Sequence, residues 1–332
     1  MIKLIKKKYW AKILLLFCTI IIPMVSFAEN IDLVYADPIP DKEFKSKNSS
    51  CSVRYDNGFI WIGTNDGLYC LKGNNLTSYL SGGTDSTSLY DNRIQKLFID
   101  QSGVLWVISM RGVCTYNPYL DNFNRILNGF ELEDDEFHQI SVINQDQNNT
   151  IYIAVERSIY SIDQQQNKQE IIYHNPELRI TDFLFDENNN IWIASENRGL
   201  IYFNTTDGTS KSFVAEKTNS RSISNNSIHD ISYDRTSKLW IATYGGGINV
   251  LNTKTLEITR YGTDNTYSDY VLSTYIDNQK NVWVCDLGGL RKYDKTSDTF
   301  VSIESLNSSG ELIEEFPSQI LQDKQGNYWT VN

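Results

Sequence analysis

The residues with the most readily interpreted chemistry are three arginines and a tyrosine in short polar segments of the chain. Arg111, Arg157 and Arg198 each follow an apolar run by a few residues, and Tyr244 precedes three consecutive glycines. A guanidinium group recognises carboxylate or sulfate through two parallel hydrogen bonds, and a tyrosine ring can stack on a sugar. These four residues are therefore predicted to bind a ligand such as an acidic glycan.

The same residues also have an ordinary explanation. Arginines on exposed loops are common and often pair with nearby acids, which here would be Glu156 and Glu196. Exposed loop tyrosines are common as well. The binding hypothesis and the explanation by solvated loops both stay open until these side chains are placed.

Patterns that would indicate catalysis are sparse. None of the three histidines, His138, His174 and His229, combines the acidic neighbour and the following proline of a phosphoacceptor site. The chain has no Gly-x-Ser-x-Gly elbow and no glycine-rich nucleotide loop. His229 is expected early in a strand as a buried, hydrogen-bonded core residue. The sequence predicts no catalytic residue and no enzyme activity.

Metal and cofactor sites are not indicated either. Residues 186–190 are similar to the start of a calcium loop, but Ile191 replaces the required glycine and Asn197 the required glutamate. The five cysteines have no Cys-x-x-Cys spacing, so neither zinc nor a dense disulfide framework is expected. The net charge of −11 argues against a nucleic-acid partner. We predict no metal, no cofactor and no nucleic acid.

A repeat must position all of these residues. Aromatic anchors recur at intervals of about 40–50 residues, and an aspartate stands six residues before each anchor except the first, where Asp56 is one residue closer. The anchors are Trp61, Trp106, Tyr152, Trp192, Trp240, Trp283 and Trp329. The aspartates are Asp100, Asp146, Asp186, Asp234, Asp277 and Asp323.

Each repeat is predicted to form four short antiparallel strands. In the second repeat, an alternating run over 94–99 ends at Asp100, a glycine turn follows, and strands are expected over 104–108, 113–116 and 123–127. Such units at this interval are typical of propeller blades. The sequence predicts an all-β propeller with six complete blades and a seventh that is truncated at the C-terminus.

The repeated residues have structural explanations. The aspartate can accept hydrogen bonds from the amides of its own turn, and the glycine supplies the positive φ of a tight hairpin. The large aromatic residue fills the wedge between successive blades. The loops between second and third strands meet the axial funnel, where propellers bind ligands, and the arginines are expected there.

The N-terminus predicts export. A lysine-rich segment, the apolar run over 13–22 and the small residues at Ser26 and Ala28 are typical of a cleaved signal peptide over 1–28. A lead-in over 29–49 and the propeller over 50–332 would follow. Because the last repeat ends after its second strand, either the chain is a fragment or the seventh blade is completed from outside.

The repeat resembles the two-component regulator propeller repeat. The resemblance is carried by Asn57-Gly58-Phe59-Ile60-Trp61-Ile62-Gly63-Thr64-Asn65-Asp66-Gly67-Leu68 and by Leu239-Trp240-Ile241-Ala242-Thr243. The segments over 87–94 and 222–228 are similar to the lead-in between blades of that family. The likeness covers roughly residues 50–332. The third repeat departs from it, because Tyr152 replaces tryptophan and Arg157-Ser158 replaces a glycine, which predicts an irregular blade.

The resemblance implies a function in signal transduction. Such repeats form the periplasmic sensor region of hybrid two-component histidine kinases, and this chain would be its N-terminal propeller. The implied ligand is an oligosaccharide derived from glycans. The kinase and its phosphorelay would lie in a C-terminal remainder tethered to the inner membrane, with homodimerisation in the full-length protein.

Two other functions stay open. The first is a stand-alone periplasmic propeller that binds protein or glycan through its rim. The second is a propeller lyase, a class whose repeats look similar. A lyase would need a histidine aimed into the funnel as base, usually with a metal holding an anionic group of the substrate.

Overall fold

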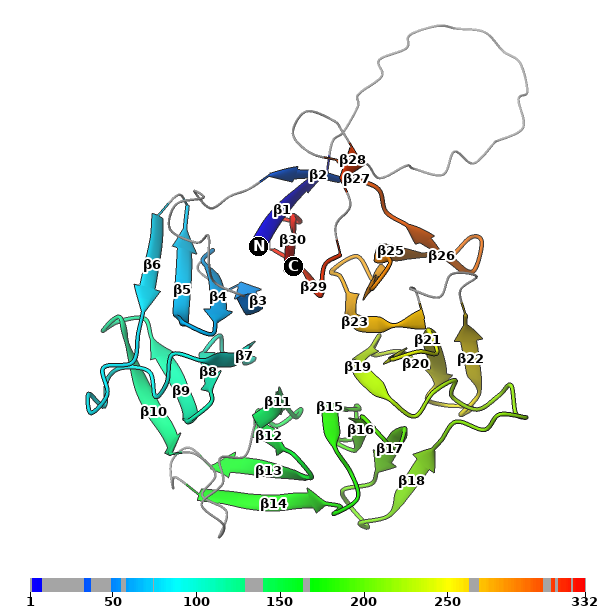
Figure 1. Ribbon diagram of the computed structural model, residues 1–332. Coiled ribbons are helices and arrows are strands. Elements are labelled where there is room, and N and C mark those ends of the chain that lie inside the picture. The colour runs from blue at the N-terminus through cyan, green and yellow to red at the C-terminus, as the bar shows by residue number, and fades with distance from the viewer. Residues whose placement is uncertain are drawn as a thin grey trace, which may run out of the picture.

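A computed structural model describes residues 2–7, 33–36, 49–54, 58–73, 75–128, 140–163, 168–262, 269–306, 312–313, 316–323 and 325–331. Their strands are gathered into seven sheets arranged in a ring, with the first strand of each repeat innermost (Figure 1). The predicted all-β propeller is confirmed. Within these residues no helix is long and apolar enough to cross a membrane. The predicted cleavage site at Ala28 and the residues Asp56 and His138 lie outside the described part.

The first three blades are four-stranded and antiparallel, with their strands in sequence order. Blade 1 contains β3 (Ser49–Arg54), β4 (Ile60–Thr64), β5 (Gly67–Lys72) and β6 (Asn75–Tyr79). Blade 2 contains β7 (Ile94–Ile99), β8 (Leu105–Ser109), β9 (Gly112–Asn117) and β10 (Asn122–Asn128). Blade 3 contains β11 (Ile140–Gln145), β12 (Ile151–Val155), β13 (Ser158–Asp163) and β14 (Lys168–His174).

The next three blades repeat this order. Blade 4 contains β15 (Ile180–Phe185), β16 (Ile191–Ser195), β17 (Leu200–Phe203) and β18 (Ser210–Phe213). Blade 5 contains β19 (Ile228–Tyr233), β20 (Lys238–Thr243), β21 (Ile248–Asn252) and β22 (Ile258–Tyr261). Blade 6 contains β23 (Val271–Ile276), β24 (Val282–Asp286), β25 (Gly289–Asp294) and β26 (Thr299–Ser302). The six complete blades are as predicted.

The seventh sheet combines both ends of the chain. The last repeat supplies only β29 (Gln319–Gln322) and β30 (Tyr328–Val331). The edge of β30 pairs with β1 (Ile2–Lys7), and β1 pairs with β2 (Leu33–Ala36). The short strands β27 (Ser305–Leu306) and β28 (Leu312–Ile313) extend the sheet beyond β2. In this structure the outer places of blade 7 are thus taken by segments from the predicted leader and lead-in.

The anchor aromatics pack between neighbouring blades. Trp106 is fully buried against the second and third strands of blade 3, and Trp192 packs on blade 5. Trp329 of blade 7 packs on Ile60 and Ile62 of blade 1. The same kind of wedge therefore holds each junction and also closes the ring between the last blade and the first.

The aspartates do more than shape their turns. In blade 2, Asp100 Oδ1 accepts hydrogen bonds from the amides of Ser102 and Val104, and Oδ2 accepts the indole N–H of Trp106 at 2.8 Å. The same indole bond joins Asp277 to Trp283 and Asp323 to Trp329. The spacing of six residues therefore brings a buried carboxylate to a buried indole.

The third blade has an additional irregularity in its outer strands, because the pairing of β13 with β14 shifts register between Ile159 and Tyr160. It has four strands in the usual order, and the hydroxyl of Tyr152 donates to Asp146 Oδ2 at 3.3 Å in place of an indole. Glu156 adopts the left-handed conformation at φ 48°, which lets the loop turn without a glycine. The phenol thus makes the same connection to its turn as the indoles do.

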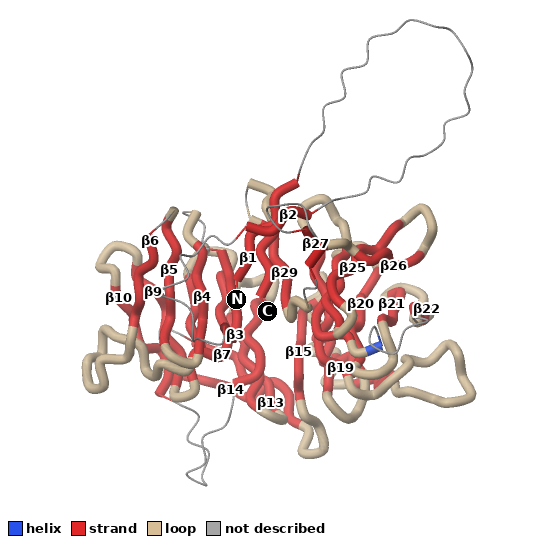
Figure 2. The backbone as a smooth tube through the Cα atoms, turned by 45° about the horizontal axis from the view of Figure 1, so that its top comes forward, coloured by secondary structure: helices blue, strands red, loops and turns tan. Residues whose placement is uncertain are grey.

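The strands end at two opposite faces of the ring (Figure 2). One face carries the loops between second and third strands together with the segments that lead into the inner strands, because Ile228 at the start of β19 pairs with Thr243 at the end of β20. We call it the rim face. The other face carries the aspartate turns and the loops between third and fourth strands, and we call it the turn face.

Candidate functional site

Every described inner strand of the six complete blades has a β-bulge at its rim end. The register shifts by one residue between Ile180 and Asp182, and between Ile228 and Asp230. Equivalent shifts occur in β3, β7, β11 and β23. A bulge leaves one residue unpaired and re-aims its side chain. In blade 5 the unpaired residue is His229, which this irregularity places at the rim face.

Three aromatic rings form a cluster at the rim of blades 5 and 6. His229 and Tyr244 stack with ring centroids 4.7 Å apart and planes at 11°, and Tyr270 meets Tyr244 edge-on at 4.8 Å. The exposed fractions of Tyr244 and Tyr270 are 41% and 36%. Tyr244 was predicted as a binding residue, whereas Tyr270 was not. The cluster offers an aromatic surface on which a sugar ring can stack.

The glycine loop after Tyr244 is held by one acceptor. The amides of Gly245, Gly246 and Gly247 all donate to the carbonyl of Asp269, at 2.8, 3.0 and 3.0 Å. Gly247 has φ 71°, and a Cβ there would lie 2.7 Å from the carbonyl oxygen of Tyr261. Only glycine therefore fits this close approach. The loop fixes the backbone of Tyr244 before any ligand arrives.

Charged side chains lie on the rim of the neighbouring blade 4. Arg198 pairs with Glu177 at 2.7 Å, and Arg179 pairs with Glu196 at 3.1 Å. Burial lowers the pKa of His229, although the charge of Glu196 acts in the opposite direction. Glu196 is thus close enough to influence the aromatic cluster, and these residues occupy one sector of the rim.

The other two predicted arginines lie on the neighbouring blades. Arg111 is exposed and has Asp91 at 3.4 Å, and Arg157 is exposed in the loop after β12. All three arginines therefore lie on the rim face of consecutive blades. The explanation by solvated loop arginines named one wrong ion-pair partner, since Glu196 pairs with Arg179 and not with Arg198. Exposed ion pairs of this kind are weak, so a ligand carboxylate can replace the protein's own.

His229 differs from the prediction. It is half-buried at the rim and stacked under Tyr244. It is not the buried, hydrogen-bonded core residue that was expected. The cause is the bulge, which turns the side chain away from the sheet. His174, by contrast, is hydrogen-bonded to Ser158 across blade 3.

Two carboxylates on inner strands were missed by the sequence analysis. Asp182 Oδ2 accepts the amide of Ile231 in the next blade, and Asp230 Oδ2 accepts both the amide and the hydroxyl of Thr274. Burial and the neighbouring Asp230 raise the pKa of Asp182 to about 7. Both carboxylates connect neighbouring inner strands. No motif marks them, because the contacts join residues more than 40 positions apart.

Three cysteines whose side chains the structure describes are apolar core residues. Cys70, Cys114 and Cys285 are buried free thiols, and burial raises the pKa of Cys285 to about 12. Thiols of this kind are neutral and unreactive. Among the described residues, no group of three or more histidine, cysteine, aspartate or glutamate side chains is placed to hold a metal.

The repeat of blade 5 matches a known repeat family. Residues 222–245, which run from the lead-in through β19 and β20 to the glycine loop, match the family described as two component regulator propeller. The chain contains a two-component regulator propeller repeat. The matched segment includes both His229 and Tyr244 of the rim cluster. No curated protein matches the sequence.

Solved structures share the propeller fold of this chain. The extracellular domain of a hybrid two-component system from B. thetaiotaomicron is 19% identical with a TM-score of 0.71, covering 86% of this chain and 38% of that one. The extracellular domain of a one-component system from the same organism is 15% identical with a TM-score of 0.54, covering 90% and 53%. The chain thus spans well under two thirds of either domain.

A lyase has the same fold. Virginiamycin B lyase from Staphylococcus aureus, solved with quinupristin, is 13% identical with a TM-score of 0.65. The match covers 87% of this chain and 96% of the lyase. At these identities the likenesses establish the propeller architecture, and function must be argued from the residues of this chain.

Proposed function

We propose that this chain is the ligand-sensing propeller of an exported two-component sensor, and that its rim face binds an oligosaccharide derived from glycans. The observation that carries the proposal is the aromatic cluster of His229, Tyr244 and Tyr270 beside the charged side chains of blade 4. The family match supports it, because the matched repeat contains two of these rings. The structure of the hybrid two-component system supports a role outside the cell.

The rim combines two recognition elements. The exposed ring of Tyr244 can stack on one sugar, while Arg198 can exchange Glu177 for a ligand carboxylate. Arg111 and Arg157 extend the positive groups along the rim. An acidic oligosaccharide satisfies both elements at once, whereas a neutral sugar would leave the guanidinium groups with their present partners.

Replacing Tyr244 with alanine should lower the affinity for digalacturonate about tenfold, because the stacking surface is lost. Isothermal titration calorimetry measures the change directly. Tyr119→Ala is the matched control, since Tyr119 is 95% exposed and lies beyond β9 on the turn face. Equal affinities of the Tyr244→Ala and Tyr119→Ala variants, or no binding by the unmodified chain, would contradict the proposal.

Export through the predicted signal peptide is part of the same proposal, with a periplasmic location, a C-terminal kinase region and a homodimer in the full-length receptor. Cleavage after Ala28 would remove β1 from blade 7 and leave β2 attached to the mature chain. The edge of β30 would then need another strand, because unpaired edges promote aggregation.

Intact-mass measurement of the protein recovered from a periplasmic extract tests this export. We expect a mature N-terminus at Glu29. Retention of the lysine-rich segment in the mature protein would show that β1 is a permanent strand of blade 7, and that the leader prediction is wrong.

A further inference from the structure

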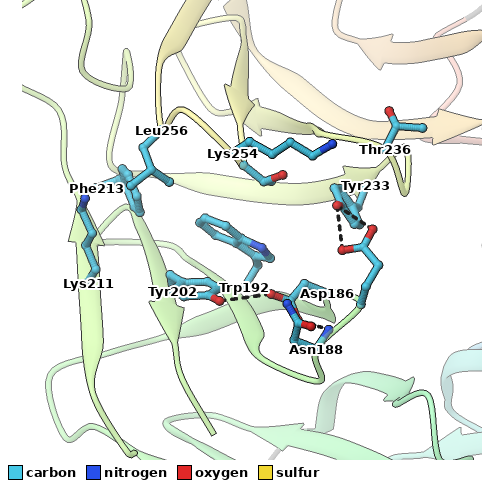
Figure 3. Close-up of a pocket in the computed structure, with 12 residues that line it drawn as sticks. Asp186, Asn188, Trp192, Tyr202, Lys211, Phe213, Tyr233, Thr236, Lys254 and Leu256 are labelled. Atoms are coloured by element: carbon cyan, nitrogen blue, oxygen red, sulfur yellow. Dashed lines mark hydrogen bonds between the residues drawn. The ribbon is translucent and has the colours of Figure 1, made fainter. Parts of the chain in front are cut away.

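A cavity opens on the turn face between blades 4 and 5, away from the rim. Its volume is about 550 Å³, within the range of small-molecule sites. Figure 3 shows Trp192 in its middle, with Tyr202 and Phe213 on one side and Tyr233 on the other. Its polar lining comes from Asp186, Glu187, Asn188, Lys211, Thr236, Thr253 and Lys254.

The indole N–H of Trp192 has no hydrogen-bond partner among the described residues, although the side chain is only 2% exposed. In blades 2, 6 and 7 the equivalent indole donates to Oδ2 of the turn aspartate. In blade 4 that oxygen, Asp186 Oδ2, accepts the hydroxyl of Tyr202 at 3.1 Å and the side-chain amide of Asn190 at 3.3 Å.

The cross-strand neighbour of Trp192 also differs from those in blades 2 and 6. Trp192 faces Tyr202 across β16 and β17, whereas Trp106 faces Thr115 and Trp283 faces Lys292 in blades 2 and 6. Tyr202 packs on the indole with ring centroids 4.6 Å apart and directs its hydroxyl at the aspartate. Figure 3 shows the indole nitrogen on the side of the ring nearer Asp186 and Tyr233. A buried donor thus lines a cavity without an acceptor, which favours a ligand that supplies one.

We propose that this cavity binds a neutral saccharide of one or two rings. The partly exposed rings of Tyr202 and Tyr233 are available for stacking, and Trp192 offers a donor to a sugar oxygen. The charged groups of the lining balance, since Asp186 and Glu187 are matched by Lys211 and Lys254. Balanced donors and acceptors suit hydroxyl groups better than a carboxylate or phosphate, which would face two acids.

Contacts within the protein hold several side chains of the cavity lining in place. The hydroxyl of Tyr233 lies 2.8 and 3.0 Å from the two carboxylate oxygens of Glu187, which joins blade 5 to the turn of blade 4. Lys211 lies over the ring of Phe213 at 5.3 Å. Leu256, at φ 60° and 37% exposed, lines the cavity beside these rings. A ligand here would contact two blades at once and stabilise their junction.

This inference deepens the proposed function, because it adds a second saccharide site on the opposite face. The test follows the indole N–H resonances of the ¹⁵N-tryptophan-labelled chain during titration with maltose and with N-acetyllactosamine. We expect the Trp192 resonance, assigned through its contacts with the rings of Tyr202 and Phe213, to move downfield as a sugar oxygen accepts its proton. The Trp240 resonance should stay in place, because its indole also lacks a partner but does not line the cavity.

Variants give a second readout. Trp192→Phe should lower the affinity for these sugars about tenfold, while Trp240→Phe, an equally buried substitution, should leave it unchanged. The cavity site is overturned if neither sugar moves the Trp192 resonance, or if binding is lost in Tyr244→Ala and kept in Trp192→Phe. The second result would leave the rim proposal intact. If the unmodified chain bound these sugars but not digalacturonate, the rim proposal would be wrong and the cavity proposal would stand.

Discussion

Replacing Asp277 with alanine is expected to destabilise the propeller by about 4 kcal/mol, because several buried donors lose their acceptor together. Asp277 is 3% exposed, and its Oδ2 accepts hydrogen bonds from Asn281, Trp283 and Tyr328. Tyr328 belongs to blade 7, so this carboxylate links two blades as well as its own turn. Urea unfolding followed by tryptophan fluorescence measures the loss.

Asp234→Ala provides the matched comparison. Asp234 Oδ1 accepts only the turn amides of Thr236, Ser237 and Lys238, and the indole of Trp240 is not bonded to it. The side chain is also more exposed, so water can replace part of what is lost. We expect a destabilisation of about 1–2 kcal/mol. Equal losses in the two variants would show that the indole and tyrosine bonds of Asp277 contribute nothing.

The pH dependence of Asp277 follows from the same contacts. Burial alone would raise its pKa, but the hydrogen bonds from Trp283, Tyr328 and Asn281 outweigh this effect and lower it. Since the folded pKa lies below the unfolded value of about 3.9, the stabilisation is complete above that pH. It is lost as the pH falls through the folded pKa. The unmodified chain should therefore be more stable than Asp277→Asn above about pH 4, and acid unfolding curves should show this difference shrinking as the pH falls below that value.

The spacing of anchors and aspartates was enough to predict the ring, because each unit is local in sequence. The turn amides of Asp100 are two and four residues away, so that part of its role could be inferred. The bond to Trp106 was not inferred, although the constant interval of six residues contained it. A fixed distance between an acceptor and an aromatic donor is the signal that could have revealed it.

The rim was only partly predictable. Loop position in the repeat was sufficient to place Arg111, Arg157, Arg198 and Tyr244 on one face. Tyr270 was missed, because it reaches Tyr244 from the following blade through a bridge that no local pattern indicates. The direction of the His229 side chain depends on a bulge, and the sequence of an inner strand does not show which residue is unpaired.

Asp182→Asn is expected to stabilise the propeller at pH 8 by on the order of 2 kcal/mol and to leave its stability nearly unchanged at pH 4. Burial and the charge of Asp230 raise the pKa of Asp182 to about 7. The carboxylate now accepts the amide of Phe183 at Oδ1 and the amide of Ile231 at Oδ2, and the asparagine oxygen can keep one of these two hydrogen bonds. Its amide group can also donate to Asp230.

The sign of this effect is opposite to that of Asp277. A carboxyl group with a raised folded pKa binds its proton more tightly in the folded state, so it favours folding below the unfolded pKa of about 3.9. That contribution is lost as the pH rises from about 4 to about 7, where two neighbouring carboxylates must both ionise. Urea unfolding at several pH values should show a falling stability for the unmodified chain and a flatter profile for Asp182→Asn.

Lys96→Met is the control, because it is expected to change the pH profile of stability in the direction opposite to Asp182→Asn. Lys96 lies on the inner strand of blade 2, and its charge lowers the pKa of both Asp182 and Asp230. Lys96→Met should therefore raise the pH at which the paired carboxyls ionise, and it should make the loss of stability above pH 7 larger. If Asp182→Asn and Lys96→Met changed the pH profile in the same direction, electrostatic coupling across the inner strands would be the wrong explanation. Opposite changes would establish that the central strands of the ring hold one shared proton near neutral pH, which ties neighbouring blades together through Ile231 and Thr274.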